Sequence, residues 1–564
     1  MGSPQLSSRV RRIPAVIVRR VAAGARERVR IDTRSLAVFR IALGLLIVAD
    51  IVLRSRNLTR FYTEQGVVPV ELAVAAESAA AYSLYAFVTS PTGVAGLFVL
   101  TALVGIALAV GYYTRPMTVV AFVLVVSLDA RNPFVLSFAD VLFATLLAIA
   151  VLLPLGERWS VDAVASDRPR RESIAGIATA LLLCQMVVMY VVNGYHKTTS
   201  ELWRSGEAAV LVLGIDEVTF LFGDTLRRAP ELLQLTGIVW VGMLCLAWLL
   251  LVFRGRARHL FVAAFAVAHL SMAVTVRIGA FSYVCLAGLL VFVQGSGWDD
   301  LGRIGRWTRR RLAAVATTFR SSSVGLSPVR LPSVPFLTVR GRLVVLARRL
   351  PRPTVVAPSR GLAAIRDRLP DGLAPHALVV AAVIGVLAIF VVAGGLSAAG
   401  VLDDDTPRSE VETGTAALVE FPTDWSIFAP VPRTTDRYYV FPARAADGTL
   451  VDAHTDRALS YERPYDELQR QHATYRERFY MVSLFDDGEV SERLAERLAE
   501  HTCSTYRTDA GATLTRVEIY LVTEEITRET IDDPAARNRA ASKLFEHGCA
   551  GDGDRDPLPP PSFD

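Results

Sequence analysis

Apolar stretches long enough to cross a bilayer dominate the first 400 positions of this 564-residue chain. A helix needs about 20 apolar residues to cross the hydrocarbon core, and a segment in lipid must satisfy its own backbone hydrogen bonds, so each stretch predicts a helix. The stretches are residues 36–54, 92–112, 116–130, 138–155, 173–194, 233–253, 259–276, 279–295 and 375–396. We therefore expect a mainly α-helical protein with a polytopic transmembrane bundle of about nine spans.

Basic residues indicate the orientation of these spans, because short loops rich in Arg and Lys stay in the cytoplasm. Residues 1–35 are rich in arginine and lack a cleavable signal pattern, so we expect this tail inside. Alternation places the basic linker 296–374 inside as well. We expect this linker to be partly disordered, because it is rich in Pro and Ser and shows no sustained periodicity. The predicted location is the cell (plasma) membrane.

Charge separates the two halves of the chain. Residues 397–564 contain 33 acidic residues against 18 Lys and Arg, whereas the first 396 residues carry a net charge of +20. We expect eight spans in a membrane domain at 36–295, then the linker, and a ninth span at 375–396 that leads to an acidic extracytoplasmic domain at 397–564. The acidic surface and the use of Arg in place of Lys suggest a halophile, since charge keeps proteins soluble at high salt.

The outer domain is predicted to have an α+β fold. Alternating residues predict strands near 436–441 and 513–522, and helical periodicity predicts helices at 466–485 and 491–501. Its only two cysteines are Cys503 and Cys549. An oxidising compartment would favour a disulfide between them.

Lysine is almost absent from the chain, since only Lys197 and Lys543 occur among the 60 basic residues. Lys197 ends the apolar stretch 173–194 and is the only lysine of the membrane domain. A desolvated lysine can lose its proton and act as a base, whereas an arginine cannot. The alternative is an interfacial anchor whose stem reaches toward the headgroups.

Ionisable residues within the predicted spans are few, and we expect the following ones to face the protein interior or a wet cavity. They are Arg40, Asp50, Asp140 and His269. Asp140 either orients Lys197 or caps its own helix. His269 either supports catalysis or packs as a hydrogen-bonded residue, and Arg40 suits binding to backbone carbonyls or to a carboxylate near a helix end. No Cys or His cluster indicates a metal site, and we expect no nucleic acid partner.

Several motifs resemble the HTTM (horizontally transferred transmembrane) family, which includes the membrane domain of vitamin K-dependent gamma-glutamyl carboxylase. The matching segments occur in the family's order within 36–295. They are Phe61-Tyr62-Thr63-Glu64-Gln65-Gly66-Val67-Val68-Pro69, Trp159-Ser160-Val161-Asp162, Asn193-Gly194-Tyr195-His196-Lys197 with Trp203 and Gly206, and Ile278-Gly279-Ala280-Phe281-Ser282-Tyr283-Val284 downstream of His269.

The resemblance implies that Lys197 corresponds to the family's catalytic lysine. In the carboxylase this lysine deprotonates reduced vitamin K, and reaction with oxygen then yields a base strong enough to take a proton from the gamma carbon of a glutamate, which captures carbon dioxide. A quinone-dependent, carboxylase-like enzyme is therefore implied, with a reduced vitamin K-type quinone and a protein or peptide substrate at the outer face. We expect Lys197, His269, Asp140 and His196 to act in catalysis, and Asn132, Arg277, Phe281 and Tyr283 to bind the cofactor. Arg277 and Asn132 are expected at the outer mouth.

The chain also departs from the carboxylase pattern. Pro133 stands where a supporting histidine is expected, and His196 is the candidate replacement. The tail segment 424–432 resembles one found in microbial HTTM proteins. The alternative function is a non-catalytic membrane scaffold that binds a partner through its acidic outer domain, with Lys197 as an anchor. A transporter is disfavoured, because no repeated pair of spans broken by Gly or Pro is found.

Overall fold

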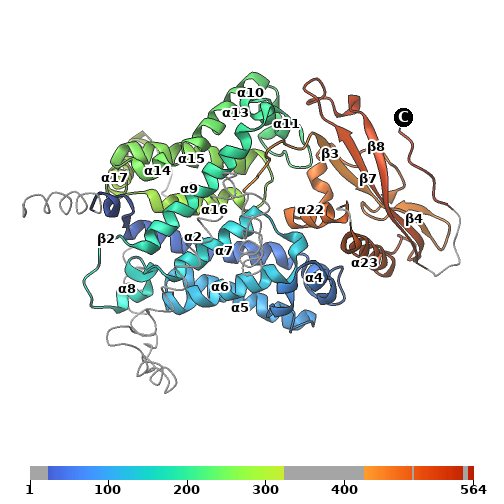
Figure 1. Cartoon of the computed structure of the whole chain (residues 1–564), viewed down its shortest axis with the longest axis horizontal. Coiled ribbons are helices and arrows are strands. Elements are labelled where there is room, and N and C mark those ends of the chain that lie inside the picture. The colour runs from blue at the N-terminus through green and yellow to red at the C-terminus, as the bar shows by residue number, and fades with distance from the viewer. Residues whose placement is uncertain (1–22, 323–424, 486–487, 550–556, 564) are drawn as a thin grey trace, which may run out of the picture.

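The computed structural model describes residues 23–322, 425–485, 488–549 and 557–563. The first range forms a helical bundle, and the others form a domain with a β-sheet that lies at one end of it (Figure 1). The start of the described chain and helix α17 (Gly295–Ser322) lie at the opposite end of the bundle. The predicted ninth span, 375–396, lies outside the described residues.

Helices form at all eight apolar stretches predicted for the membrane domain. They are α2 (Thr33–Ser55), α5 (Pro91–Val110), α6 (Thr114–Arg131), α7 (Phe138–Val151), α9 (Ile177–Thr198), α13 (Pro230–Cys245) with α14 (Leu249–Val252), α15 (Gly255–Thr275), and α16 (Phe281–Leu289) followed by η4 (Leu290–Phe292). Within the described residues, α2, α5, α9 and α15 are long and apolar enough to cross a membrane, and a bent pair of helices at 281–308 could add a fifth span. A mainly helical membrane bundle is confirmed, and the count of nine spans stays a prediction.

Local sequence explains where these helices begin and end. The carboxylate of Asp32 accepts the backbone N–H of Arg34 at the start of α2, and Ser90 caps α5 just before Pro91. Helix α5 ends at Gly111, whose φ of +72° is the left-handed conformation that glycine adopts without strain. Such caps satisfy the free backbone groups of each helix end.

Short elements join the long helices at both ends of the bundle. At the end near the outer domain these are α3 (Leu58–Tyr62), α4 (Val70–Ala76), η1 (Ser78–Tyr82), η2 (Pro133–Val135), α10 (Glu201–Ser205), α11 (Glu207–Gly214) and α12 (Gly223–Arg227). At the opposite end are η3 (Leu155–Glu157), α8 (Val161–Ala165) and the antiparallel pair β1 (Ile31–Asp32) and β2 (Ser173–Ile174). The connections at 55–91 and 206–232 therefore contain short helices.

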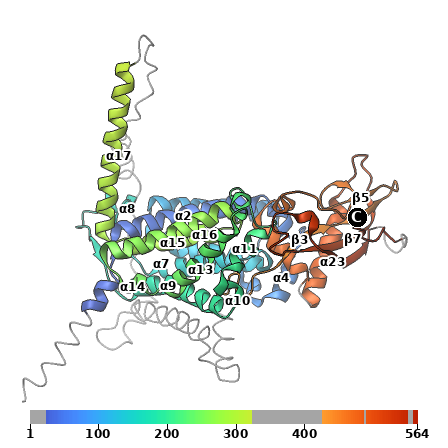
Figure 2. The same ribbon diagram turned by 90° about the horizontal axis from the view of Figure 1, so that it is seen from above.

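Helix α17 corrects the expected structure of the linker. Residues 295–322 form one long helix, which bends by 106° from the preceding helix and projects across the long axis of the molecule (Figure 2). Four glycines, at 295, 297, 302 and 305, interrupt its periodicity in the sequence. Glycine weakens a helix without forbidding it, so the sequence pattern did not predict this helix. The rest of the predicted linker lies outside the described residues.

The described residues of the outer domain form an antiparallel sheet of six strands. They are β3 (Thr435–Val440), β4 (Pro442–Ala445), β5 (Leu450–Asp452), β6 (Arg457–Ala458), β7 (Leu514–Glu525) and β8 (Arg539–Gly548). The long strand β7 is central, with β3 and β4 on one side and β8 on the other. Tyr439 on β3 is paired with Leu521 on β7, which is paired in turn with Ser542 on β8.

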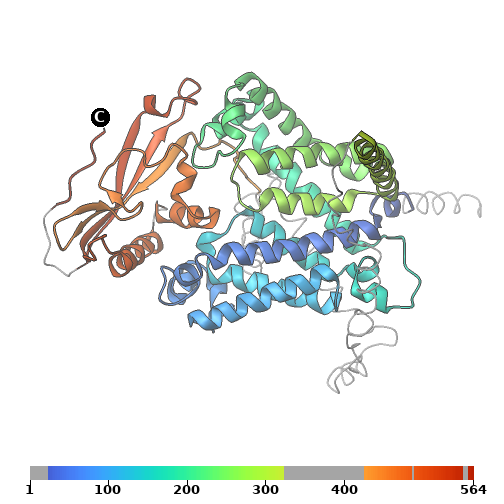
Figure 3. The ribbon, with the colours of Figure 1, turned by 180° about the vertical axis from the view of Figure 1, so that it is seen from behind.

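Two helices connect the sheet to the bundle. Helix α22 (Tyr475–Val482) lies between the sheet and the bundle and contacts η2, whereas α23 (Glu489–Thr505) packs on β7, β8 and α4 (Figures 1 and 3). The predicted helix at 466–485 is instead three pieces, η5 (Leu468–Gln471), α22 and η6 (Ser483–Phe485). The break occurs because Thr474 caps a new helix by accepting the N–H of Glu477.

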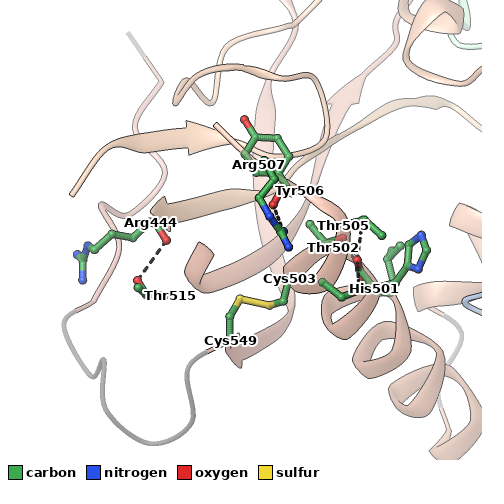
Figure 4. Close-up of a disulfide and its surroundings, with 11 residues drawn as sticks. Arg444, His501, Thr502, Cys503, Thr505, Tyr506, Arg507, Thr515 and Cys549 are labelled. Atoms are coloured by element: carbon green, nitrogen blue, oxygen red, sulfur yellow. Dashed lines mark hydrogen bonds between the residues drawn. A yellow bond between two sulfur atoms is a disulfide. The ribbon is translucent and has the colours of Figure 1, made fainter. Parts of the chain in front are cut away.

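The predicted disulfide between Cys503 and Cys549 is present, with Cα atoms 5.5 Å apart. Figure 4 shows that it joins the end of α23 to the end of β8. The bond therefore fixes the end of the helix against the sheet.

Candidate functional site

Lys197 is buried in the last turn of α9, with only 2% of its surface exposed. Its Nζ donates hydrogen bonds to the carbonyls of Ile427, at 2.7 Å, and Phe428, at 3.4 Å. The Nζ also lies 3.7 Å from the centroid of the Trp203 ring, which is close enough for a cation–π contact. No carboxylate in the described ranges pairs with Lys197. Its amine therefore faces only carbonyl dipoles and one aromatic face.

The acceptors of Lys197 belong to a segment of the outer domain, residues 425–428. Asn193, one helical turn before Lys197 on α9, donates its amide to the carbonyls of Trp425, at 2.7 Å, and Ile427, at 3.1 Å. The indole N–H of Trp203 donates to the carbonyl of Phe428 at 2.7 Å. Three donors from the bundle thus hold the backbone of this segment beside the amine.

A cavity of about 960 Å³ extends from Lys197 between α9, α13 and α15. Its wall is almost entirely apolar, and the polar groups Asn193 and Lys197 lie together in it. Leu260 and Val267 of α15 line the cavity and are also 75% and 66% exposed on the outside of the bundle. The cavity is therefore open to the surface that faces lipid in a membrane.

His269 packs behind this cavity and is fully buried. Its Nε2 forms a hydrogen bond of 2.8 Å with the hydroxyl of Tyr190, and its ring contacts the rings of Trp240 and Phe281. Tyr190 lines the cavity and lies between His269 and the open space. These contacts agree with the hydrogen-bonded packing alternative for His269, and its role in catalysis stays a prediction. Tyr190 was missed by sequence reasoning, although its spacing of seven residues from Lys197 places both on one helix face.

Asp140 is not the partner of Lys197, and that hypothesis was wrong. One oxygen of Asp140 accepts the N–H and the hydroxyl of Ser137, at 2.8 and 2.9 Å, which caps α7. The other oxygen accepts from Arg54 at 3.3 Å and from Arg476 of the outer domain at 2.7 Å. The capping alternative is therefore observed, and two guanidinium groups explain why a carboxylate is stable there.

The residues predicted to bind a cofactor do not share one mouth. Phe281 lines the Lys197 cavity, whereas Arg277 and Tyr283 line a second cavity of about 1000 Å³. Asn132 lines neither, because its amide donates to the carbonyl of Phe61 at 3.0 Å and accepts from the N–H of Phe134 at 3.2 Å. In the described ranges, no group of three or more His, Cys, Asp or Glu residues is arranged to hold a metal ion.

His196 follows Tyr195 on α9 and, like Asn132, lines neither cavity. Its ring contacts the ring of Tyr195 at 5.8 Å between centroids. Its Nε2 is buried and has no hydrogen-bond partner in the described part of the chain. Adjacent helix positions point about 100° apart, so proximity to Lys197 in the sequence does not bring the imidazole into the Lys197 cavity.

Comparison with known families supports the sequence resemblance. Residues 29–298 match the family model of the HTTM domain. This part of the chain belongs to the HTTM family. Neither the curated proteins nor the solved structures contain a significant match. The HTTM domain accordingly covers the whole described bundle and the start of α17, and the outer domain lies beyond the match.

The Trp-Ser-x-Asp motif at 159–162 and the buried residue Arg40 serve the architecture of the HTTM domain. Arg40, fully buried in α2, donates to the carbonyls of Leu155, at 3.1 Å, and Trp159, at 2.6 Å. Asp162 accepts the backbone N–H groups of Tyr113, at 3.0 Å, and Thr114, at 2.7 Å, and so caps the start of α6. The Trp-Ser-x-Asp motif therefore organises the end of the bundle remote from Lys197.

Buried ion pairs fix the outer domain on the HTTM domain. The carboxylate of Asp436 accepts the backbone N–H groups of Asp216, at 2.7 Å, and Glu217, at 3.0 Å. Burial alone would raise the pKa of Glu217, but its ion pair with Arg433 and its contact with His472 outweigh burial and hold the pKa well below its usual range. Glu217 is therefore ionised at neutral pH. These contacts hold the segment 425–428 over Lys197.

Proposed function

We propose that this protein is a membrane enzyme of the carboxylase-like type in which Lys197 acts as a base on a reduced quinone. The observation that carries the proposal is a buried amine without a carboxylate partner in the described ranges, placed at an apolar cavity that opens to the lipid-facing surface. An amine in such a place is a usable base only if it is neutral for part of the time.

The cavity fits an isoprenoid quinone by its chemistry. Its volume of about 960 Å³ is in the range of small-molecule sites. Its apolar wall suits a hydrocarbon tail, and its polar groups, Asn193 and Lys197, suit a ring with oxygen substituents. When bound, a reduced vitamin K-type quinone would supply an acidic hydroxyl and reducing equivalents. The exposed side chains of Leu260 and Val267 mark an entrance from the bilayer.

The contacts of Lys197 allow it to gain and lose one proton in place. An ammonium group has three N–H donors, and two of them are used by the carbonyls of Ile427 and Phe428. Loss of the third proton leaves both hydrogen bonds and frees one lone pair as a proton acceptor. Asn193 and Trp203 are positioning residues, because they hold the same backbone segment that holds Lys197. The substrate in this proposal is a glutamate-containing protein or peptide at the outer face.

The two lysines of this chain make a labelling experiment specific. In a Lys543→Arg background, Lys197 and the N-terminal amine are the only amines, and peptide mapping separates them. We expect an amine-specific reagent to modify Lys197 slowly in detergent, and a reduced menaquinone to protect it. Equal labelling of Lys197 at all quinone concentrations would contradict quinone binding at this cavity.

An assay of carboxylation distinguishes the two roles considered for Lys197, a catalytic base and an anchor. We expect acid-stable incorporation of labelled bicarbonate into a glutamate-containing peptide, dependent on reduced quinone and oxygen. Lys197→Arg keeps the charge but should lower this rate by about 100-fold or more, the usual contribution of a general base. Lys543→Arg, on the exposed strand β8, is the matched control and should keep full activity.

The alternative is a non-catalytic scaffold in which Lys197 joins the two domains, and one observation favours it: the Nζ hydrogen bonds end on carbonyls of the outer domain. A scaffold would show neither quinone protection nor incorporation. In a scaffold, Lys197→Met would release the segment 425–428 from α9, whereas Lys197→Arg would keep it bound.

A further inference from the structure

The second cavity has no role in the proposed function and lies between α2 and α16, which are adjacent in the bundle (Figure 3). Its volume is about 1000 Å³. Residues from Ala42 to Arg54 on one face of α2 line it. With a rise of 1.5 Å per residue, these 12 steps correspond to a length of about 18 Å. The cavity is thus long enough to hold an extended hydrocarbon chain.

Polarity along this cavity is strongly asymmetric. The part formed by Leu45, Val262 and Leu290 is apolar, and the charged side chains gather at the end beneath the outer domain. They are Asp50, Arg54, Asp129, Asp140, Arg277, Arg470 and Arg476. An occupant should therefore be amphipathic, with its polar group at the ends of the helices. A bilayer lipid has its headgroup at this level.

Charge at the polar end favours an anion. The three aspartates are paired with Arg54 and Arg476, which leaves this buried cluster with one excess negative charge. Arg277 and Arg470 add two positive charges, and neither has an ion pair with a carboxylate in the described ranges. The polar end as a whole is net positive by one charge.

Arg277 and Arg470 keep donors for a ligand. The two terminal nitrogens of Arg277 donate to the carbonyls of Gln469, at 2.7 Å, His472, at 3.3 Å, and Ala473, at 3.2 Å. A guanidinium has five N–H donors, so two remain. Arg470 is exposed, and its guanidinium lies 5.7 Å from the centroid of the Tyr465 ring. The paired N–H groups of a guanidinium match the spacing of two phosphate oxygens.

The cavity is accessible from the side of the bundle. Leu45 of α2 and Tyr283 of α16 both line it, and they are 58% and 51% exposed. Because these helices present their outer faces to lipid, a molecule can enter from the bilayer without passing through water. This access favours a membrane lipid over a soluble anion.

We propose that this cavity binds a phospholipid with an anionic headgroup. One acyl chain lies along α2 and α16, and the phosphate is bound by Arg277 and Arg470. The site is separate from the Lys197 cavity, so this inference does not depend on the proposed enzymatic activity. Because Arg277 also holds outer-domain carbonyls, a bound lipid would stabilise the docking of the outer domain.

Lipid titration of the full-length, delipidated protein in detergent, followed by native mass spectrometry, tests this inference. We expect phosphatidylglycerol to bind at least ten times more tightly than phosphatidylcholine. Arg470→Gln should weaken phosphatidylglycerol binding about tenfold, as expected for loss of a hydrogen bond between charged groups. Arg507→Gln removes another exposed arginine of the outer domain and is the matched control, which should bind like the wild type.

A steric variant keeps the test decisive, because Arg277→Gln could disturb the domain interface. Ala49 lines the cavity and is exposed on α2, so Ala49→Trp should fill the channel and abolish phosphatidylglycerol binding without disturbing the buried core. Equal binding of the two lipids, or wild-type binding by both Arg470→Gln and Ala49→Trp, would overturn the proposal. Tighter binding of oleate than of phosphatidylglycerol would overturn it as well, because the ligand would then be a fatty acid.

Discussion

Arg476 of the outer domain is the side chain on which the docking of α22 depends most. It reaches into the HTTM domain, where its guanidinium contacts Asp50, with Nε at 3.1 Å, and Asp140, at 2.7 Å. It also donates to the carbonyl of Val135 at 3.0 Å. We predict that Arg476→Met releases α22 from the bundle, because the two carboxylates lose a buried cation and keep only Arg54.

The free-energy cost of Arg476→Met follows from the charges in this cluster. Three aspartates and two arginines give a formal net charge of −1, and Arg476→Met makes this formal charge −2. Removing one partner of a buried ion pair costs about 3–5 kcal/mol. By contrast, Arg493 and Glu71 form an exposed pair in the same domain interface at 2.9 Å. Such pairs contribute about 0–1 kcal/mol, so Arg493→Met is the matched control.

Amide hydrogen exchange of the full-length protein, resolved by mass spectrometry, measures this local opening. At 1.36 kcal/mol per tenfold change, we expect exchange in α22 to accelerate by about two to four orders of magnitude in Arg476→Met. The control should accelerate it by less than about tenfold. Strand β7, inside the sheet, should change little in either variant.

A double-mutant cycle tests the electrostatic origin of the effect. Asp140→Asn keeps an oxygen for the cap of α7 and removes one negative charge, so Arg476→Met combined with Asp140→Asn returns the cluster to −1. We expect the double variant to recover most of the lost protection. If the effects of the two substitutions on amide exchange in α22 simply add, the reasoning from buried charge is refuted, and Arg476 acts by packing alone.

Three further predictions concern the rest of the molecule. Replacing Cys503 and Cys549 with serine should lower the stability of the outer domain by about 4 kcal/mol, as expected for a closed loop of 46 residues; an unchanged thermal midpoint would contradict this. Burial lowers the pKa of His454 to about 4. The contribution of His454 to the free energy of unfolding is therefore full above pH 6.5 and falls by about 3 kcal/mol as the pH drops to 4. His454→Phe should flatten the resulting dependence of the thermal midpoint on pH. Gly206 has a φ of +81°, and a Cβ there would lie 2.1 Å from the carbonyl oxygen of Gln234. Gly206→Ala should therefore lower the thermal midpoint. Gly242→Ala is the control and should not lower it, because nothing lies within 4 Å of the Cβ that it adds.

The helices of the bundle were predictable because the length of an apolar stretch is a property of the sequence itself. Helices lie at all eight apolar stretches predicted for the HTTM domain, within a few residues at most ends. Helix α17 was not predictable in this way, since its glycines and arginines resemble those of a loop. Strand β8 was also missed, because it alternates weakly and lies at the edge of the sheet, where little of it is buried.

The candidate site was only partly predictable. The scarcity of lysine identified Lys197, and the family motif supported it, but neither revealed which groups surround the amine. The carbonyls of Ile427 and Phe428 lie about 230 positions away in the sequence. Asp140 was assigned to Lys197 because both were expected near the same end of the bundle, and the structure pairs it with Arg54 and Arg476 instead.

The sequence by itself determined the helical membrane domain, the position of Lys197 at the end of a helix and the cysteine pair of the outer domain. Each depends on local periodicity, hydrophobic length or residue count. The tertiary structure decided that Phe281 and Arg277, both predicted to bind the cofactor, line two different cavities, that the outer domain covers Lys197, and that Arg476 neutralises Asp50 across 426 positions of sequence. Local patterns fix which face of a helix is apolar, whereas only the packing of distant segments fixes which charges and carbonyls meet there.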